Sequence, residues 1–148
     1  MTESTLKMRF GRSVLSVAAA VCISLTMAGT ANAAEDDGKL EDTEFGLYYN
    51  SNNAGCVFDI WVGDADFRDN YFKSPSILLN CSGIGRLVDN DAASYWNRSH
   101  GTFYVFTGYK GGGLEGSIPA GYSGNASPNY KNALSSAGNK TMRDIWKP

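Results

Sequence analysis

The chain of 148 residues carries 13 Lys and Arg against 15 Asp and Glu, which gives a formal net charge of −2. A mildly acidic chain without a basic cluster cannot neutralise a row of phosphates, so we exclude a nucleic-acid partner. The length is sufficient for one compact domain and too short for two separate cores.

The N-terminus has the three parts of a secretory signal peptide. Residues 7–12 carry three basic side chains, residues 14–27 are apolar, and residues 28–33 are small and end in Ala-Asn-Ala. The apolar run has about 14 residues, whereas a membrane-spanning helix needs about 20. We therefore predict that residues 1–33 are removed, that the protein is secreted to the extracellular space, and that it has no membrane anchor.

Residues 34–44 are acidic and nearly devoid of large apolar side chains. Such a segment cannot offset its ordering entropy by burial, so it is expected to be a flexible leader. The composition changes at Phe45, and we predict one domain over residues 45–148 that is monomeric.

Short apolar runs separated by Gly, Asn, Ser and Pro predict strands. Residues 56–62 place Cys56, Phe58, Ile60 and Val62 on one face, which leaves Trp61 on the other. In the second half, residues 101–106 and 114–120 predict further strands, 123–129 a loop, and 145–146 a closing strand or a docked tail. No segment keeps a helical period, so we expect low helix content and an all-β sandwich or barrel.

Two cysteines, Cys56 and Cys81, remain after the signal peptide is removed. Thiols pair in an oxidising compartment, and closing a loop of about 25 residues stabilises a fold by roughly 3 kcal/mol. A metal pair or a nucleophilic cysteine is the alternative, but the chain has a single His to accompany either. We predict a disulfide.

Two related polar loops indicate an internal repeat. The first is residues 90–94 (Asn-Asp-Ala-Ala-Ser), with Tyr95 next, and the second is residues 131–136 (Lys-Asn-Ala-Leu-Ser-Ser). Each half also places an aromatic residue seven positions before a glycine. The pairs are Tyr48 with Gly55, and Tyr104 with Gly111.

These motifs resemble those of the βγ-crystallin fold, in which each Greek-key unit carries such an aromatic and such a loop. More closely, the signal peptide, the single domain and the sequence motif at residues 90–98 resemble the secreted actinobacterial proteins of peptidase inhibitor family 36. The resemblance covers about residues 45–136. It implies a βγ-crystallin-like sandwich of two Greek keys, about residues 45–100 and 101–148, and inhibition of a thermolysin-like metalloprotease.

The resemblance also implies that the two polar loops lie side by side, where their oxygens could surround calcium. The candidate donors are Asn90, Asp91, Ser94, Asn132 and Ser135. The ammonium group of Lys131 would oppose an ion there. The alternative is that Ser94 and Ser135 hydrogen-bond the backbone, and we favour it. We expect no required cofactor.

The first unit is longer than the second, and we expect the insertion at residues 63–76. An inserted surface loop is a suitable position for a binding function. The candidate contact residues are Asp64, Asp66, Phe67, Arg68, Tyr71 and Phe72. The glycine-rich segment 108–113 is the second candidate loop.

Enzyme chemistry has little support. His100 is the single His and has no catalytic motif around it, so we expect a binding protein and not an enzyme. The predicted function is inhibition of an extracellular (metallo)protease. The alternatives are a calcium-binding or purely structural extracellular protein, and a small toxin or cell-wall-binding module in which exposed aromatic side chains contact carbohydrate.

Overall fold

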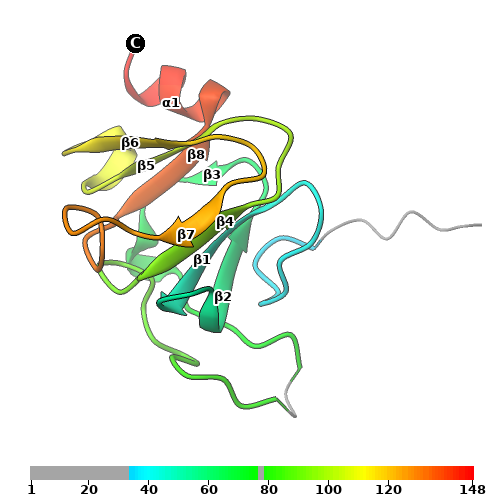
Figure 1. Cartoon of the computed structure of the whole chain (residues 1–148). Helices are drawn as coiled ribbons and strands as arrows, with labels where there is room; N and C mark the ends of the chain where they lie inside the picture. Colours follow the sequence, from blue (N-terminus) through cyan, green and yellow to red (C-terminus); the bar gives the residue numbers. More distant parts are fainter. Residues whose placement is uncertain (1–33, 77–78) are drawn as a thin grey trace, which may run out of the picture. The chain divides into compact units, whose positions relative to one another are not determined.

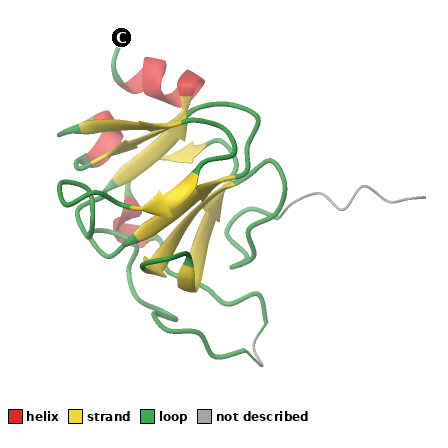
Figure 2. Ribbon diagram, viewed as in Figure 1, coloured by secondary structure: helices red, strands yellow, loops and turns green. Residues whose placement is uncertain are grey.

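A computed structural model describes residues 34–76 and 79–148, so the predicted signal peptide at residues 1–33 lies outside the described residues. The described strands form two four-stranded antiparallel sheets, with strand orders β2-β1-β4-β7 and β3-β8-β5-β6 (Figures 1 and 2). The arrangement confirms the predicted all-β sandwich. The strands are β1 Phe45–Asn50, β2 Ala54–Ile60, β3 Gly63–Asp64, β4 Ser94–Asn97, β5 Phe103–Phe106, β6 Glu115–Ile118, β7 Ser123–Asn125 and β8 Ser136–Asn139.

The third strand of each half crosses to the sheet of the other half. β3 pairs with β8 of the second half, and β7 pairs with β4 of the first half. Each half is therefore a Greek key whose third strand completes the opposite sheet. Because of this exchange, neither half can bury its own apolar face without the other.

The two halves repeat the same pairing around a shared core. Phe45 lies opposite Ile60 in the first sheet, and Phe103 lies opposite Ile118 in the second. The Phe45 and Phe103 rings stack with their centroids 4.6 Å apart and their planes within 6°. Equivalent residues of the repeat thus meet face to face where the two sheets pack.

Strand β2 follows the predicted alternation and is also covered on its outer face. Cys56, Phe58 and Ile60 are buried as expected, but Val57 and Asp59 are buried too. The prediction for Val62 is wrong: it lies beyond the end of the strand and is exposed, like its neighbour Trp61. Two chain segments outside the sheets account for the covered outer face.

The first of these segments is residues 34–44, which cross β2 instead of standing free as a solvated leader. The carboxylate of Asp59 accepts hydrogen bonds from the backbone N–H groups of Gly38 (2.8 Å) and Asp37 (3.2 Å). The Leu40 side chain packs where a larger residue at Gly46 would place its Cβ. The Asp59 carboxylate on β2 therefore holds this segment in place. Composition alone cannot show which backbone groups such a carboxylate will accept from.

The C-terminal end forms helix α1, Lys140–Trp146, where a closing strand or docked tail was predicted. The side chain of Asn139 caps it by accepting from the Met142 N–H at 3.1 Å, and the Trp146 ring lies edge-on to Phe106 at 6.0 Å. The prediction of a loop over residues 123–129 is wrong in part, since Ser123–Asn125 is the crossing strand β7. None of the helices in the described residues is long and apolar enough to span a membrane.

Candidate functional site

The two polar loops lie side by side and exchange backbone hydrogen bonds. The Asn90 N–H donates to the Leu134 carbonyl at 2.9 Å, and the Asn132 N–H donates to the Ala92 carbonyl at 2.8 Å. Asn90 and Asn132 both adopt left-handed φ values, 60° and 54°, which Asn tolerates better than most residues. The exchange sets the register of the repeat, with residues 89–94 equivalent to 131–136.

Ser94 folds the hairpin between β1 and β2. Its buried hydroxyl donates to the Asn50 carbonyl at 2.5 Å and accepts from the Asn53 N–H at 3.0 Å. With these two bonds the hydroxyl satisfies buried backbone groups of the hairpin. The structural role favoured for Ser94 over a metal-ligating one therefore agrees with its contacts.

Ser136 makes the equivalent contacts in the second half, so the pairing of Ser94 with Ser135 was wrong by one residue. The Ser136 hydroxyl donates to the Gly108 carbonyl at 2.6 Å and accepts from the Gly111 N–H at 3.2 Å. Two adjacent serines cannot be told apart by composition. Only the sheet register decides which one faces the hairpin.

The same register corrects the aromatic and glycine pair of the second half. Tyr48 and Phe106 occupy equivalent positions, since they lie opposite Ser94 and Ser136 respectively. Gly113, seven residues after Phe106, has a φ of 70°, as Gly55 has a φ of 83°. The second pair is therefore Phe106 with Gly113, and not Tyr104 with Gly111.

The predicted calcium donors fit an ion poorly. The Asp91 carboxylate is paired with Arg86, whose Nη2 lies 2.8 Å away. Lys131 lines the same recess as Asp91, and its ammonium donates to Ser51 Oγ of the β1–β2 hairpin at 2.9 Å. Asp89 Oδ1 is the one side-chain oxygen of these loops that is buried without a hydrogen bond in the described chain. Across residues 34–76 and 79–148, no three acidic, His or Cys side chains come close enough to hold a metal.

The second segment covering β2 is the connection between β3 and β4, residues 65–93, which is far longer than its counterpart at residues 126–135. The predicted disulfide between Cys56 and Cys81 is confirmed and fastens it to β2, with Cα atoms 5.1 Å apart. Next to it the Cys56 N–H donates to the Ser82 carbonyl at 2.9 Å, and Val57 exchanges two backbone hydrogen bonds with Lys73. The insertion expected at residues 63–76 thus begins later and extends further.

Within this connection, residues 70–73 and 85–88 form a small two-stranded ribbon. The Phe72 N–H donates to the Arg86 carbonyl and the Gly85 N–H donates to the Phe72 carbonyl, both at 2.9 Å. Tyr71 lies opposite Leu87 on this ribbon. Tyr71, Leu87 and Ile84 are exposed by 46%, 42% and 50%. These large apolar side chains therefore face solvent, although the disulfide and the hydrogen bonds to β2 hold the connection in place.

Two of the predicted contact residues face the core instead. Phe67 and Phe72 are both 0% exposed, so the expectation that they offer a binding surface is wrong. Phe67 lies edge-on to Phe58 at 5.4 Å between ring centroids, and Phe72 lies edge-on to Tyr49 at 5.6 Å. An aromatic residue in a charged loop can either anchor the loop to the core or form part of its exposed surface, and its burial shows which of the two it does.

The remaining predicted contact residues bring the two candidate loops together. The Asp66 carboxylate pairs with Arg68 at 2.5 Å, and this hydrogen-bonded guanidinium lowers the pKa of Asp66 to about 2. Arg68 in turn lies 3.9 Å above the ring of Tyr109, and the Lys110 N–H donates to the Ala65 carbonyl. Asp64 belongs to the edge strand β3 and accepts from the Asp66 N–H.

His100 lies in the loop between β4 and β5, beside an open groove that also contacts Trp61. Among the described residues, no carboxylate or hydroxyl is hydrogen-bonded to its imidazole. A dyad for nucleophilic catalysis is therefore not assembled around it.

No protein-family model matches the sequence, and no curated protein does. Among solved structures, one from work on the evolution of the eye lens βγ-crystallin domain fold is similar, with a TM-score of 0.50 and 18% identity over 66% of this chain and 84% of that one. Also similar are an archaeal βγ-crystallin (TM-score 0.47, 16% identity, 67% and 99% covered) and one from Ciona intestinalis (0.45, 13%, 66% and 99%). At such identities the first likeness shows the fold alone, and the chain has a βγ-crystallin-like fold.

Proposed function

We propose that the protein is secreted and inhibits an extracellular protease, with the connection at residues 65–93 as its contact surface. The observation that supports this is a chain segment fastened by a disulfide that nevertheless exposes Tyr71, Ile84 and Leu87. The resemblance of the loop motifs to peptidase inhibitor family 36 suggests a metalloprotease as the target class.

A fastened segment is what an inhibitor of a protease cleft requires. Binding orders the inserted chain, and a backbone that is already ordered loses less conformational entropy on insertion. Here Gly83 lies against the Tyr49 ring, so closely that a Cβ at residue 83 would come within 2.2 Å of it. The backbone on the N-terminal side of Ile84 is therefore held by both the ring and the nearby disulfide.

The contact is expected to be apolar at its centre and charged at its rim. Burying the side chains of Ile84 and Leu87 in a protease pocket would contribute about 1.5–3 kcal/mol each. The ion pair of Arg68 with Asp66 lies at the start of the same connection, with the Arg68 guanidinium over the Tyr109 ring of the neighbouring loop. Such an exposed pair contributes more to orientation than to affinity.

The purified protein should be assayed for inhibition of a thermolysin-like metalloprotease and of a subtilisin-like serine protease. We expect inhibition of the metalloprotease and a loss of about 100-fold or more when Ile84→Asp and Leu87→Asp are combined, because two apolar contacts are replaced by charges. Leu114→Asp is the matched control, since Leu114 is equally exposed but lies outside the connection.

Two outcomes would contradict the proposal. If micromolar protein inhibits neither protease, the proposed inhibitor function is wrong. Inhibition that the double variant retains in full, with circular dichroism like that of the wild type, would remove the connection as its site.

A further inference from the structure

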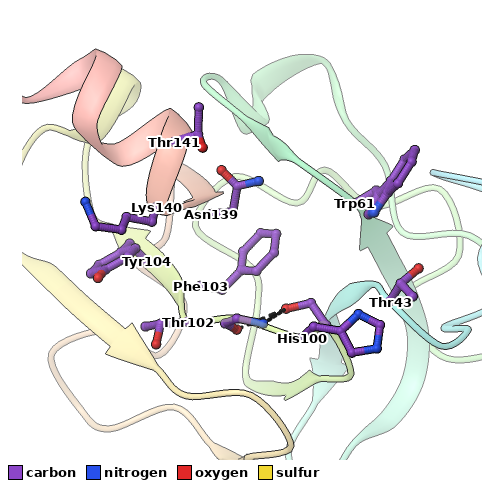
Figure 3. A pocket seen from close by; sticks show the side chains of 11 residues that line it. Thr43, Trp61, His100, Thr102, Phe103, Tyr104, Asn139, Lys140 and Thr141 are labelled. Atoms are coloured by element: carbon purple, nitrogen blue, oxygen red, sulfur yellow. Dashed lines mark hydrogen bonds between the residues drawn. The ribbon is translucent and has the colours of Figure 1, made fainter.

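An open groove of about 560 Å³ lies where the end of β2, the loop before β5 and the start of α1 come together. Figure 3 shows Trp61 on one side of it, Tyr104 and Lys140 on the other, and the ring of Phe103 between them. The groove shares no residue with the connection at residues 65–93. It is therefore separate from the proposed protease contact.

Trp61 provides a flat apolar wall that the core does not use. Its side chain is 60% exposed, although the residue follows directly after the buried end of β2. Its backbone N–H donates to Glu35 Oε1 at 3.1 Å, which fixes the chain at this point. At the equivalent position after β6 the second half has Pro119, so the repeat does not require an indole here.

The opposite wall is also held in place. The guanidinium of Arg143 lies 5.5 Å from the centroid of the Tyr104 ring, and Arg143 Nε donates to Glu115 at 3.1 Å. The Lys140 ammonium is paired with Asp144 at 2.5 Å. Its charge is thus compensated within α1.

Between the walls the groove offers neutral polar groups. The Oδ1 atom of Asn139 is used by the helix cap, while its amide nitrogen is turned toward the Trp61 side (Figure 3). Hydroxyl groups of Thr43, Thr102 and Thr141 also line the groove, and no Asp or Glu does within the described chain. Together with the imidazole of His100, the lining combines donors and acceptors with no uncompensated carboxylate or ammonium.

We propose that this groove binds a neutral oligosaccharide, with a sugar ring against Trp61. A pyranose has an apolar C–H face that fits a flat indole and a rim of hydroxyl groups that fits amide and hydroxyl partners. A purely apolar ligand would leave these polar groups without hydrogen bonds at a cost of about 1–3 kcal/mol each. An ionic ligand would find no uncompensated opposite charge from Lys140 or from a carboxylate.

The test is titration of the full protein with cellohexaose, chitohexaose and xylohexaose, followed by intrinsic tryptophan fluorescence and by calorimetry. We expect one of these glycans to bind and Trp61→Ala to weaken it by about 10-fold or more, as loss of a stacked aromatic ring implies. Trp61→Phe is expected to retain part of the affinity. Trp96→Ala is the matched control, because Trp96 is exposed on β4 outside the groove.

Failure of all three glycans to bind at about 5 mM, which would largely saturate a site with a Kd of about 1 mM, would overturn the proposal. Binding that Trp61→Ala leaves unchanged would equally overturn it. The combined Ile84→Asp and Leu87→Asp variant is expected to bind the glycan normally. Glycan binding and protease inhibition are therefore tested independently.

Discussion

The two halves of this protein share one framework and differ in what connects their third and fourth strands. In the second half residues 126–135 make a short connection, whereas in the first half residues 65–93 form a ribbon, a disulfide anchor and a 3₁₀ turn that buries Phe67. The shared framework consists of positions that repeat, such as Ser94 and Ser136. The proposed protease contact lies where the repeat is broken.

The halves also differ in how fully their cores are filled. Phe58 lies opposite Leu47 on β1 in the first sheet, and at the equivalent place opposite Val105 the second has Gly116. Phe67 packs against Phe58, whereas near Gly116 a pocket of about 190 Å³ remains beside Tyr130. Both connections contribute to the core: the long one adds the buried Phe67, Phe72 and Val88, and the short one adds the buried Leu134 and the partly buried Tyr130.

The largest effect that distinguishes the halves is expected from Ile60→Ala compared with Ile118→Ala. The two residues are equivalent, but Ile118 borders the existing pocket and Ile60 does not. We expect urea denaturation to show losses of about 4 kcal/mol for Ile60→Ala and about 2–3 kcal/mol for Ile118→Ala, within the usual range for such truncations. Equal losses would show that the two cores are filled alike.

Replacement of both Cys56 and Cys81 by Ser is expected to cost about 3 kcal/mol, the loop-closure contribution for this separation. The loosening should be confined to the first half, because the disulfide joins β2 to the long connection. Amide exchange is expected to accelerate at residues 79–88 and to remain slow in β5 and β8. Uniform acceleration in both halves would contradict this division.

A pH dependence is expected from the segment that crosses β2. Burial raises the pKa of Glu44 to about 7 and that of Asp59 to about 6, so the folded state binds more protons than the unfolded state between about pH 4 and 7. The contribution of these two groups to the unfolding free energy is therefore full below about pH 4 and is lost progressively as pH rises to about 8.

Asp59→Asn together with Glu44→Gln should flatten this profile, as followed by urea denaturation at each pH. The Asn side chain retains an oxygen that can accept from the Gly38 N–H. A double variant with the wild-type pH profile would assign the dependence to other groups.

A smaller effect tests the register of the repeat. Ser136→Ala and Ser94→Ala are each expected to cost about 1–2 kcal/mol, because each leaves backbone groups of a hairpin without their hydroxyl partner. Ser135→Ala should cost less, since Ser135 lacks these contacts to the second hairpin. Thermal denaturation of the three variants measures the difference, and a larger loss for Ser135→Ala would reverse the assignment.

The smallest effect is expected from calcium. We propose that the protein folds without it, because Lys131 lines the same recess as Asp91 and Arg86 occupies the Asp91 carboxylate. Addition of millimolar calcium is expected to raise the unfolding free energy by less than about 0.5 kcal/mol, which corresponds to little occupancy. A clear rise that Asp89→Ala abolishes would instead identify a site at the buried Asp89 oxygen.

Local patterns in the sequence were sufficient to predict the all-β class, the disulfide, the buried face of β2 at Cys56, Phe58 and Ile60, and the repeat itself. Alternation and turn residues are patterns of neighbouring residues, and the cysteine count is read directly from the chain. Predictions based on them therefore do not require knowledge of the fold. Tertiary structure alone decided which of Ser135 and Ser136 completes the repeat, because register depends on pairing between distant strands. It likewise decided that Phe67 and Phe72 face the core while Ile84 and Leu87 face solvent, since burial is set by segments that meet only in space.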